Sequence, residues 1–135
     1  MNKIITASIP KDQLVKAYLT LWNGILQLTD KELLIMESLV SKYLELQLVI
    51  KDSKYLYEVL FSTQSLKDIR IRLNLKEQTL NNYKVSLKSK GILIIDRDGN
   101  YSLDERVIPV NQITFKFETH DYNNRGNNRT ETDKE

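Results

Sequence analysis

Three amide side chains lie close together in this sequence, at Gln78, Asn81 and Asn82. An asparagine or glutamine amide can form two hydrogen bonds at once with the edge of an adenine in the major groove of DNA. The chemistry that these residues could perform is therefore recognition of base edges. The same amides could also be ordinary polar residues on a helix surface, and their types alone do not separate the two interpretations.

The segment that contains these amides is the basic part of the chain. Residues 65–90 include seven cations and two anions, whereas the remaining residues include 13 cations and 16 anions. Proteins that bind nucleic acid draw much of their affinity from phosphates neutralised by lysine and arginine. The segment is therefore suited to phosphate contact, although a solvated lysine-rich face would have the same composition.

Other kinds of functional site find little support. The chain has one histidine, His120, no cysteine and four scattered glycines, so it offers little for a zinc site, a histidine-based triad or a phosphate-binding loop. Four acidic residues near the predicted hairpin lack the spacing of a calcium loop: Asp96, Asp98, Asp104 and Glu105. We therefore expect no catalytic residue, no metal, no cofactor and no enzymatic activity.

Two helices and a hairpin are predicted to position the amides. The first helix starts at Ser65, a plausible cap, and Asn74 suits the sharp turn that follows it. The second helix covers 77–90, stops at Gly91 and faces inward with Leu80, Tyr83 and Leu87. A strand from Ile92 to Asp96, a primed turn at Asp98-Gly99 and a returning strand with Tyr101 and Leu103 complete the hairpin.

The upstream sequence predicts three more helices. Residues 11–28 carry an apolar stripe that could pack on the core or form a subunit interface: Leu14, Tyr18, Leu21, Ile25 and Leu28. Thr29 and Glu32 form a capping box that starts a helix reaching about Leu48. Residues 55–61 suit a helix or a strand, and we favour a helix capped by Ser53.

The ends of the chain are less regular. Ile4-Ile5-Thr6 is a β-prone patch that could pair with the hairpin or remain a loose arm. Val107 to Val110 should be extended because Pro109 restricts its neighbour. Residues 112–118 alternate like a half-buried strand, with Ile113, Phe115 and Phe117 on one side, and the polar composition of 119–135 predicts a flexible tail.

At residues 79–93 the run T-L-N-N-Y-K-V-S-L-K-S-K-G-I-L resembles the recognition helix and first wing strand of winged helix-turn-helix DNA-binding domains. The preceding I-R-I-R-L-N-L, residues 69–75, is similar to the first helix and turn of that motif. The resemblance covers about 40 of the 135 residues. It implies a mainly α fold with a small β-hairpin (α+β), in which an N-terminal arm and helix (1–28) precede a winged-helix domain (29–118) and a tail (119–135).

The resemblance also implies which residues meet DNA. By position, the residues that face the bases would be Gln78, Thr79, Asn81, Asn82 and Val85. Lys84, Lys88 and the wing residue Arg97 would meet phosphate. Three further cations of the basic segment are also candidates for DNA contact: Lys67, Arg72 and Lys76. The sequence departs from the family pattern at Lys76, where a capping Ser or Thr is usual, and at Arg70 and Ile71, where small and polar residues are usual.

Two functions are consistent with these features. The first is a regulator of transcription or replication that binds double-stranded DNA through the helix 77–90. The alternative is a structural or adaptor protein, such as a component of a phage or another large assembly, that uses the same fold to contact protein. A partner protein or a second copy would then dock on the helix 11–28.

The sequence also predicts where the chain acts. It contains no run of 18 apolar residues and does not open with a cleavable signal pattern. Its lack of cysteine fits a reducing compartment. We therefore expect a cytoplasmic protein without a membrane partner.

Overall fold

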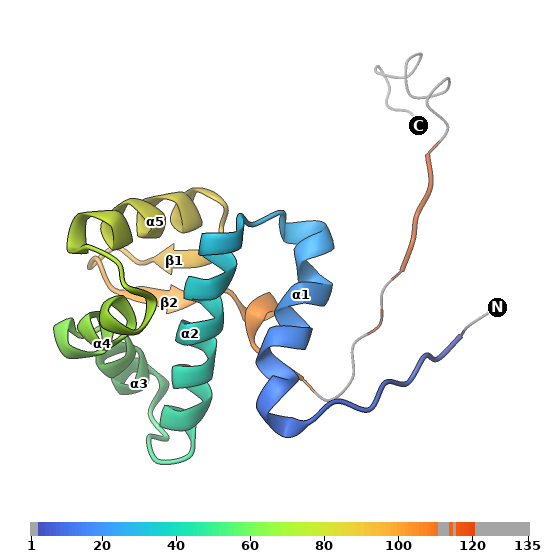
Figure 1. Ribbon diagram of the computed structural model, residues 1–135, viewed down its shortest axis with the longest axis horizontal. Helices are drawn as coiled ribbons and strands as arrows, with labels where there is room; N and C mark the ends of the chain where they lie inside the picture. The colour runs from blue at the N-terminus through green and yellow to red at the C-terminus, as the bar shows by residue number, and fades with distance from the viewer. Residues whose placement is uncertain (1–2, 111–113, 115, 121–135) are drawn as a thin grey trace.

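The computed structural model describes residues 3–110, 114 and 116–120. Helices dominate this part of the chain, with one two-stranded antiparallel sheet (Figure 1). The predicted mainly α architecture with a small hairpin is confirmed at this level. The elements are, in order, η1 (Lys11–Gln13), α1 (Leu14–Leu26), α2 (Asp30–Gln47), α3 (Ser53–Leu60), α4 (Thr63–Leu73), α5 (Glu77–Ser89), β1 (Leu93–Ile95), β2 (Tyr101–Leu103) and η2 (Glu105–Val107).

Helix α2 lies at the centre of the molecule. It packs against α1, α3 and α4, and α1 lies on the opposite side of it from α4 (Figure 1). The buried side chains of α2 include Ile35, Met36, Leu39 and Val40. Because complete burial of a Leu or Ile side chain is worth about 1.5–3 kcal/mol, this central helix carries much of the stability on which the other elements depend.

Three helix starts show how local chemistry sets the boundaries. The capping box is confirmed, because Thr29 accepts from the N–H of Glu32 and Glu32 accepts from the N–H of Thr29. The helix favoured over residues 55–61 forms, but it covers Ser53–Leu60, because Asp52 caps it in place of Ser53. Helix α4 begins at Thr63 rather than at Ser65, because Ser62 takes the capping position. Ser65 is buried instead, and its hydroxyl donates to the carbonyl of Val59 at 2.7 Å.

The turn between α4 and α5 forms as predicted. Asn74 adopts the left-handed conformation with φ 56° and ends α4, and Leu75 packs against the core. Helix α5 buries Leu80 and Leu87, while Tyr83 is half-buried. Gly91, with φ 77°, ends the α5 segment as predicted.

The hairpin is confirmed, but its turn is not the primed type. Leu93 pairs with Leu103 and Ile95 with Tyr101, and the loop between the strands is closed by the N–H of Gly99, which donates to the carbonyl of Asp96 at 3.1 Å. Within the loop only Gly99 has a positive φ, 84°, which is typical of a longer loop with a bulge glycine. The Asp96 carboxylate favours this loop because it accepts from the N–H groups of Asp98 and Asn100, each at 2.9 Å.

We predict that Gly99→Ala lowers the free energy of unfolding by about 1–2 kcal/mol, because a Cβ disfavours the left-handed conformation. Gly24→Ala is the matched control. Gly24 lies inside α1, and a methyl group on its Cα would meet nothing within 4 Å. Alanine there should therefore raise the free energy of unfolding by about 0.5–1 kcal/mol. Urea unfolding measures both, and a stabilising Gly99→Ala would contradict the loop assignment.

The predicted inner face of α1 is only partly correct. Tyr18 and Leu28 are buried together with Leu19, whereas Leu14, Leu21 and Ile25 are 40, 59 and 58 % exposed. Apolar side chains cover more of the circumference of this helix than the rest of the domain buries. Periodicity alone therefore placed the centre of the buried side about one residue away from where it lies. The helix also starts with a 3-10 turn, η1, and ends at Leu26 with Gln27 left-handed.

The residues near the two ends of the domain differ in part from expectation. Ile4 and Ile5 are exposed and have no regular structure, so the patch does not pair with the hairpin. Ile108, which precedes Pro109, is extended as predicted. Val107 is not, because the Asp104 side chain caps a 3-10 turn, η2, in which Val107 is the buried last residue.

Two further predictions fall largely outside the described part of the chain. Residues 112, 113 and 115 of the predicted strand 112–118 are among those not described. Residues 121–135 of the predicted tail are also outside it. Where it is described, the predicted strand is wrong: residues 114 and 116–118 have no regular structure, and Phe117, expected on the buried side, is 92 % exposed. Alternation of apolar and polar residues does not by itself supply a neighbouring strand or surface to pack on. The rest of the strand and the flexible tail remain predictions.

Among the described residues, no helix is long and apolar enough to cross a membrane.

Candidate nucleic-acid interface

One face of α5 presents polar side chains to solvent. Gln78, Asn81, Asn82, Val85 and Lys88 are all exposed, and the opposite side of the helix is fixed to the core by Leu80 and Leu87. The Gln78 amide donates to the Asn82 amide oxygen at 3.0 Å, one turn further along the helix. The structure therefore brings the three predicted amides together on one accessible surface.

Two predicted residues at the start of α5 are placed less favourably for contact with a base. Thr79 is half-buried. Lys76 is exposed at the N-cap position and makes no capping hydrogen bond through its side chain, as its departure from the family pattern suggested. The first-turn N–H groups of α5 consequently lack a side-chain acceptor at the cap, a situation that favours an anion near the helix start.

Exposed cations lie on α5 and on the elements next to it, since α4 and the hairpin both contact α5. Lys67 and Arg72 are exposed on α4, and Lys88 and Arg97 are exposed on α5 and in the hairpin loop. Within the described part of the chain none of these four forms an ion pair. Asp68, one of the two anions of the basic segment, pairs with Lys42 at 3.6 Å. Most of the positive charge of the segment is thus available at the surface.

Lys84 is placed differently from the other residues predicted to meet phosphate. Its Nζ lies 4.5 Å from the centroid of the Tyr101 ring, and burial lowers the pKa of Lys84. A cation held over an aromatic face attaches the middle of α5 to strand β2. Lys84 therefore joins the helix to the hairpin, and its ammonium is less available to a phosphate than that of Lys88.

For the DNA binding expected from the sequence, we predict that Lys88→Ala weakens affinity several-fold and makes the salt dependence less steep by about one in log–log slope, because one phosphate contact would be lost. Lys84→Met, which keeps the apolar stem, should change that slope little and lower the free energy of unfolding by about 0.5–1 kcal/mol. Fluorescence anisotropy over a salt series and urea unfolding measure the two effects. Equal slopes for both variants would contradict this division of roles.

The tip of the hairpin is acidic around its single arginine. Arg97 lies between Asp96 and Asp98, and the pKa of Asp96 is lowered by hydrogen bonds, chiefly from the main chain of Asn100. Asp96 is therefore ionised at neutral pH and repels a nearby phosphate. The two carboxylates therefore offset part of the attraction between Arg97 and a phosphate.

Sequence reasoning missed the residue that holds α5 in place. The side chain of Glu32, in the first turn of α2, is buried. Its carboxylate accepts from the Lys90 ammonium at 2.6 Å, from the Ser86 hydroxyl and from the Thr29 N–H at 2.8 Å. Burial acts to raise the pKa of Glu32, but the hydrogen bonds from Lys90, Ser86 and Thr29 outweigh it and lower the pKa to about 2.

A signal for this contact was present in the sequence. Glu32 lies four residues before Met36 and seven before Leu39, which places it on the buried face of its helix. The capping box accounted for Glu32 within its own helix, so its contacts with Ser86 and Lys90 on the other side of the domain were not predicted. A buried carboxylate needs hydrogen-bond and charge partners, and the Lys90 ammonium, which reaches in from the surface, is its cationic partner.

No protein-family model, curated protein or solved structure matches this chain. The function proposed below is therefore inferred from the geometry around α5.

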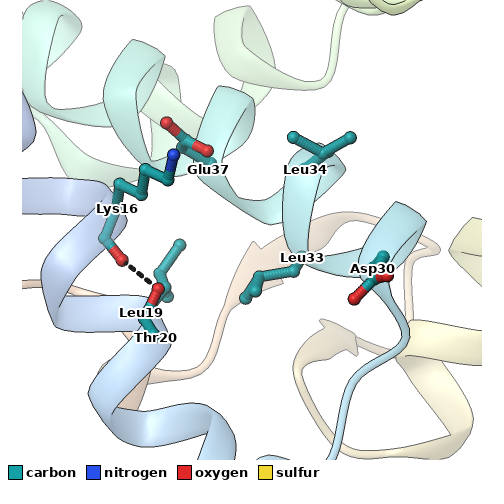
Figure 2. A pocket seen from close by; sticks show the side chains of 7 residues that line it. All are labelled: Lys16, Leu19, Thr20, Asp30, Leu33, Leu34 and Glu37. Carbon is teal, nitrogen blue, oxygen red and sulfur yellow. Dashed lines mark hydrogen bonds between the residues drawn. The ribbon is translucent and has the colours of Figure 1, made fainter.

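A hollow of about 250 Å³ between α1 and α2 offers no competing chemistry (Figure 2). Its walls are mainly aliphatic, from Leu19, Leu33 and Leu34. Figure 2 shows Lys16 and Glu37 at one end of it and Asp30 at the other. None of the predicted site residues line this hollow.

Proposed function

We propose that this chain is a winged-helix protein that binds double-stranded DNA with α5 in the major groove. The observation that carries the proposal is the division of α5 into two faces. Leu80 and Leu87 are buried on one face, while the three amides are exposed together on the other. The major groove of B-DNA is about 12 Å wide and accepts one helix, so a helix that projects only one polar face is suited to it.

The side chains on the exposed face match the chemistry of base edges. Asn81 and Asn82 can each pair with an adenine through two hydrogen bonds, and Val85, which is 63 % exposed, can contact a thymine methyl group. Gln78 already donates to Asn82, which orients the Asn82 amide before any DNA arrives. This arrangement supports a preference for A·T-containing sites.

The order of elements and the charge around α5 support the same proposal. Helices α2, α4 and α5 followed by the β1–β2 hairpin correspond to the winged-helix order, with α3 as an additional helix between α2 and α4. Lys67, Arg72, Lys76 and Lys88 lie on α4, at the start of α5 and on α5, where they can neutralise phosphates on the two sides of a groove. The acidic hairpin tip makes the wing a minor contributor. A regulator of transcription or replication that acts in the cytoplasm is the role we infer.

The test is a titration of the full chain against labelled duplexes of mixed sequence, about 25 base pairs long, at roughly 50 and 200 mM salt. We expect binding that weakens at least about a hundredfold between the two concentrations, because counterions are released when phosphates are neutralised. Duplexes rich in A·T should bind more tightly than duplexes rich in G·C. Absence of binding at the lower salt concentration, or binding that does not depend on salt, would overturn the proposal.

The exposed apolar side of α1 favours a second candidate, a protein-contact role through a second copy of the chain. Leu14, Leu21 and Ile25 recur at intervals of seven and four residues, as in the seam of paired helices, and Lys16 is the only charged residue of α1. Light scattering tests this role: Leu21→Lys should convert a dimer into a monomer, whereas Thr20→Lys, an exposed change on the same helix, should not. A wild-type chain that stays monomeric at high micromolar concentration would exclude it.

A further inference from the structure

A groove of about 550 Å³ separates α3 from the hairpin. Three half-buried aromatic residues line it, Tyr57, Phe61 and Tyr101. The rings of Phe61 and Tyr101 stack with centroids 5.3 Å apart. The groove includes none of the exposed amides of α5, so it is a separate surface from the candidate DNA interface.

One side of the groove is the outer edge of strand β2. In an antiparallel pair, residues whose main chains bond to the partner strand alternate with residues whose main chains point outward. The main-chain N–H of Asp96 donates to the carbonyl of Asn100, and that of Asp104 donates to the carbonyl of Ile92. By this alternation, the main-chain N–H and C=O groups of Tyr101 and Leu103 point away from β1. The main chain of Leu103 is hydrogen-bonded to the Tyr57 hydroxyl. The N–H and C=O of Tyr101 point away from β1 and are placed to pair with a further strand.

The charge of the groove selects the partner. Glu58, Asp96 and Asp98 line it together with a single cation, Lys54, which gives it the opposite sign from the surface around α5. Lysine and arginine side chains are attracted both to carboxylates and to aromatic faces. The Tyr101 ring already lies between Lys84 and Phe61, so the carboxylates are the groups that attract a basic partner. A segment with alternating basic residues would place its cations against these carboxylates while its main chain pairs with β2.

We propose that this groove binds an extended basic segment of a partner protein, which adds to the outer edge of β2 as a third strand. The main-chain hydrogen bonds come from the N–H and C=O of Tyr101, and the basic side chains contact the carboxylates of Glu58 and Asp98. The hairpin thereby connects a protein partner to the domain without covering the exposed face of α5. This proposal does not depend on DNA binding.

The test uses three synthetic peptides, each about seven residues long, and the full-length ¹⁵N-labelled chain. The first peptide alternates Arg or Lys with Val, the second replaces each cation with Glu, and the third replaces the central Val with Pro, which removes a main-chain N–H. We expect the first peptide to shift amide signals of residues 54–61 and 96–103. The other two should bind at least about tenfold more weakly.

Two charge reversals in the groove and one outside it locate the binding. Glu58→Lys and Asp98→Lys should each lower the affinity of the basic peptide at least about fivefold. Glu77→Lys, an exposed change at the start of α5, should leave that affinity within about twofold of the wild-type value. DNA binding of the first two variants should be unchanged or stronger, which separates this test from that of the proposed function. Equal affinity for the three peptides, shifts confined to α5, or no shift at millimolar basic peptide would overturn the proposal.

Discussion

Replacement of Glu32 by glutamine is expected to remove about 3 kcal/mol of stability at pH 7 and much less at pH 2. The pKa of Glu32 is about 2 in the folded chain, against an ordinary value of 4.5. A lowered pKa means that the folded state binds its proton less readily than the unfolded state does. The stabilisation from Glu32 is therefore complete above pH 4.5 and is lost as the pH falls toward 2.

The measurement is the difference in free energy of unfolding between the wild type and Glu32→Gln, taken from urea unfolding at several pH values. That difference should shrink by about 3 kcal/mol between pH 7 and pH 2. Other carboxyl groups with a lowered pKa, those of Asp96 and Asp104, are present in both proteins and cancel. Glu45→Gln, an exposed change on the same helix, is the control. A difference that does not vary with pH would contradict the assigned role of Glu32.

Removal of the four exposed cations around α5 is expected to have the largest effect on DNA binding. A variant with Gln at positions 67, 72, 76 and 88 should bind duplex DNA at least about a hundredfold more weakly at low salt. Its log–log salt slope should be less steep by about 3 to 4, because each lost phosphate contact removes about 0.9 from that slope. The measurement is fluorescence anisotropy with the duplex that the wild type binds, over a salt series.

A matched variant separates local contact from net charge. Four exposed lysines outside the interface can be changed to Gln with the same loss of charge: Lys3, Lys11, Lys16 and Lys51. This control should alter the slope by less than about one, since distant surface charges are screened beyond roughly 10 Å at 0.1 M salt. If both variants lose affinity equally, the binding is a general effect of charge and α5 has no special role.

Features that depend on neighbouring residues were predictable from the sequence. The capping box at Thr29, the left-handed Asn74 and the helix stop at Gly91 each follow from the chemistry of a few adjacent residues. The exposed amides followed from helical spacing, since Leu80 and Leu87 fix the buried side of α5. These local rules were sufficient to place the three amides on one surface.

Features that depend on distant residues were not predictable in the same way. The buried side of α1 is decided by how much of its apolar arc α2 and η2 can cover, which periodicity does not state. The contact between Lys84 and Tyr101 requires knowing how the hairpin folds back on α5. The loop at Gly99 was assigned the wrong turn because the Asp96 carboxylate, outside the Asp-Gly pair, selects the longer loop.

The contacts of Glu32 also affect how the chain folds. They join Glu32 to Ser86 and Lys90, which are 54 and 58 residues further along the chain, so they form only after a long loop has closed. The start of α2 and the end of α5 should consequently open together, and their amide hydrogen-exchange rates should rise in parallel in Glu32→Gln. During synthesis, a nascent chain that stops short of Lys90 leaves the Glu32 carboxylate without its cation, so this connection between α2 and α5 is complete only once that lysine has been added.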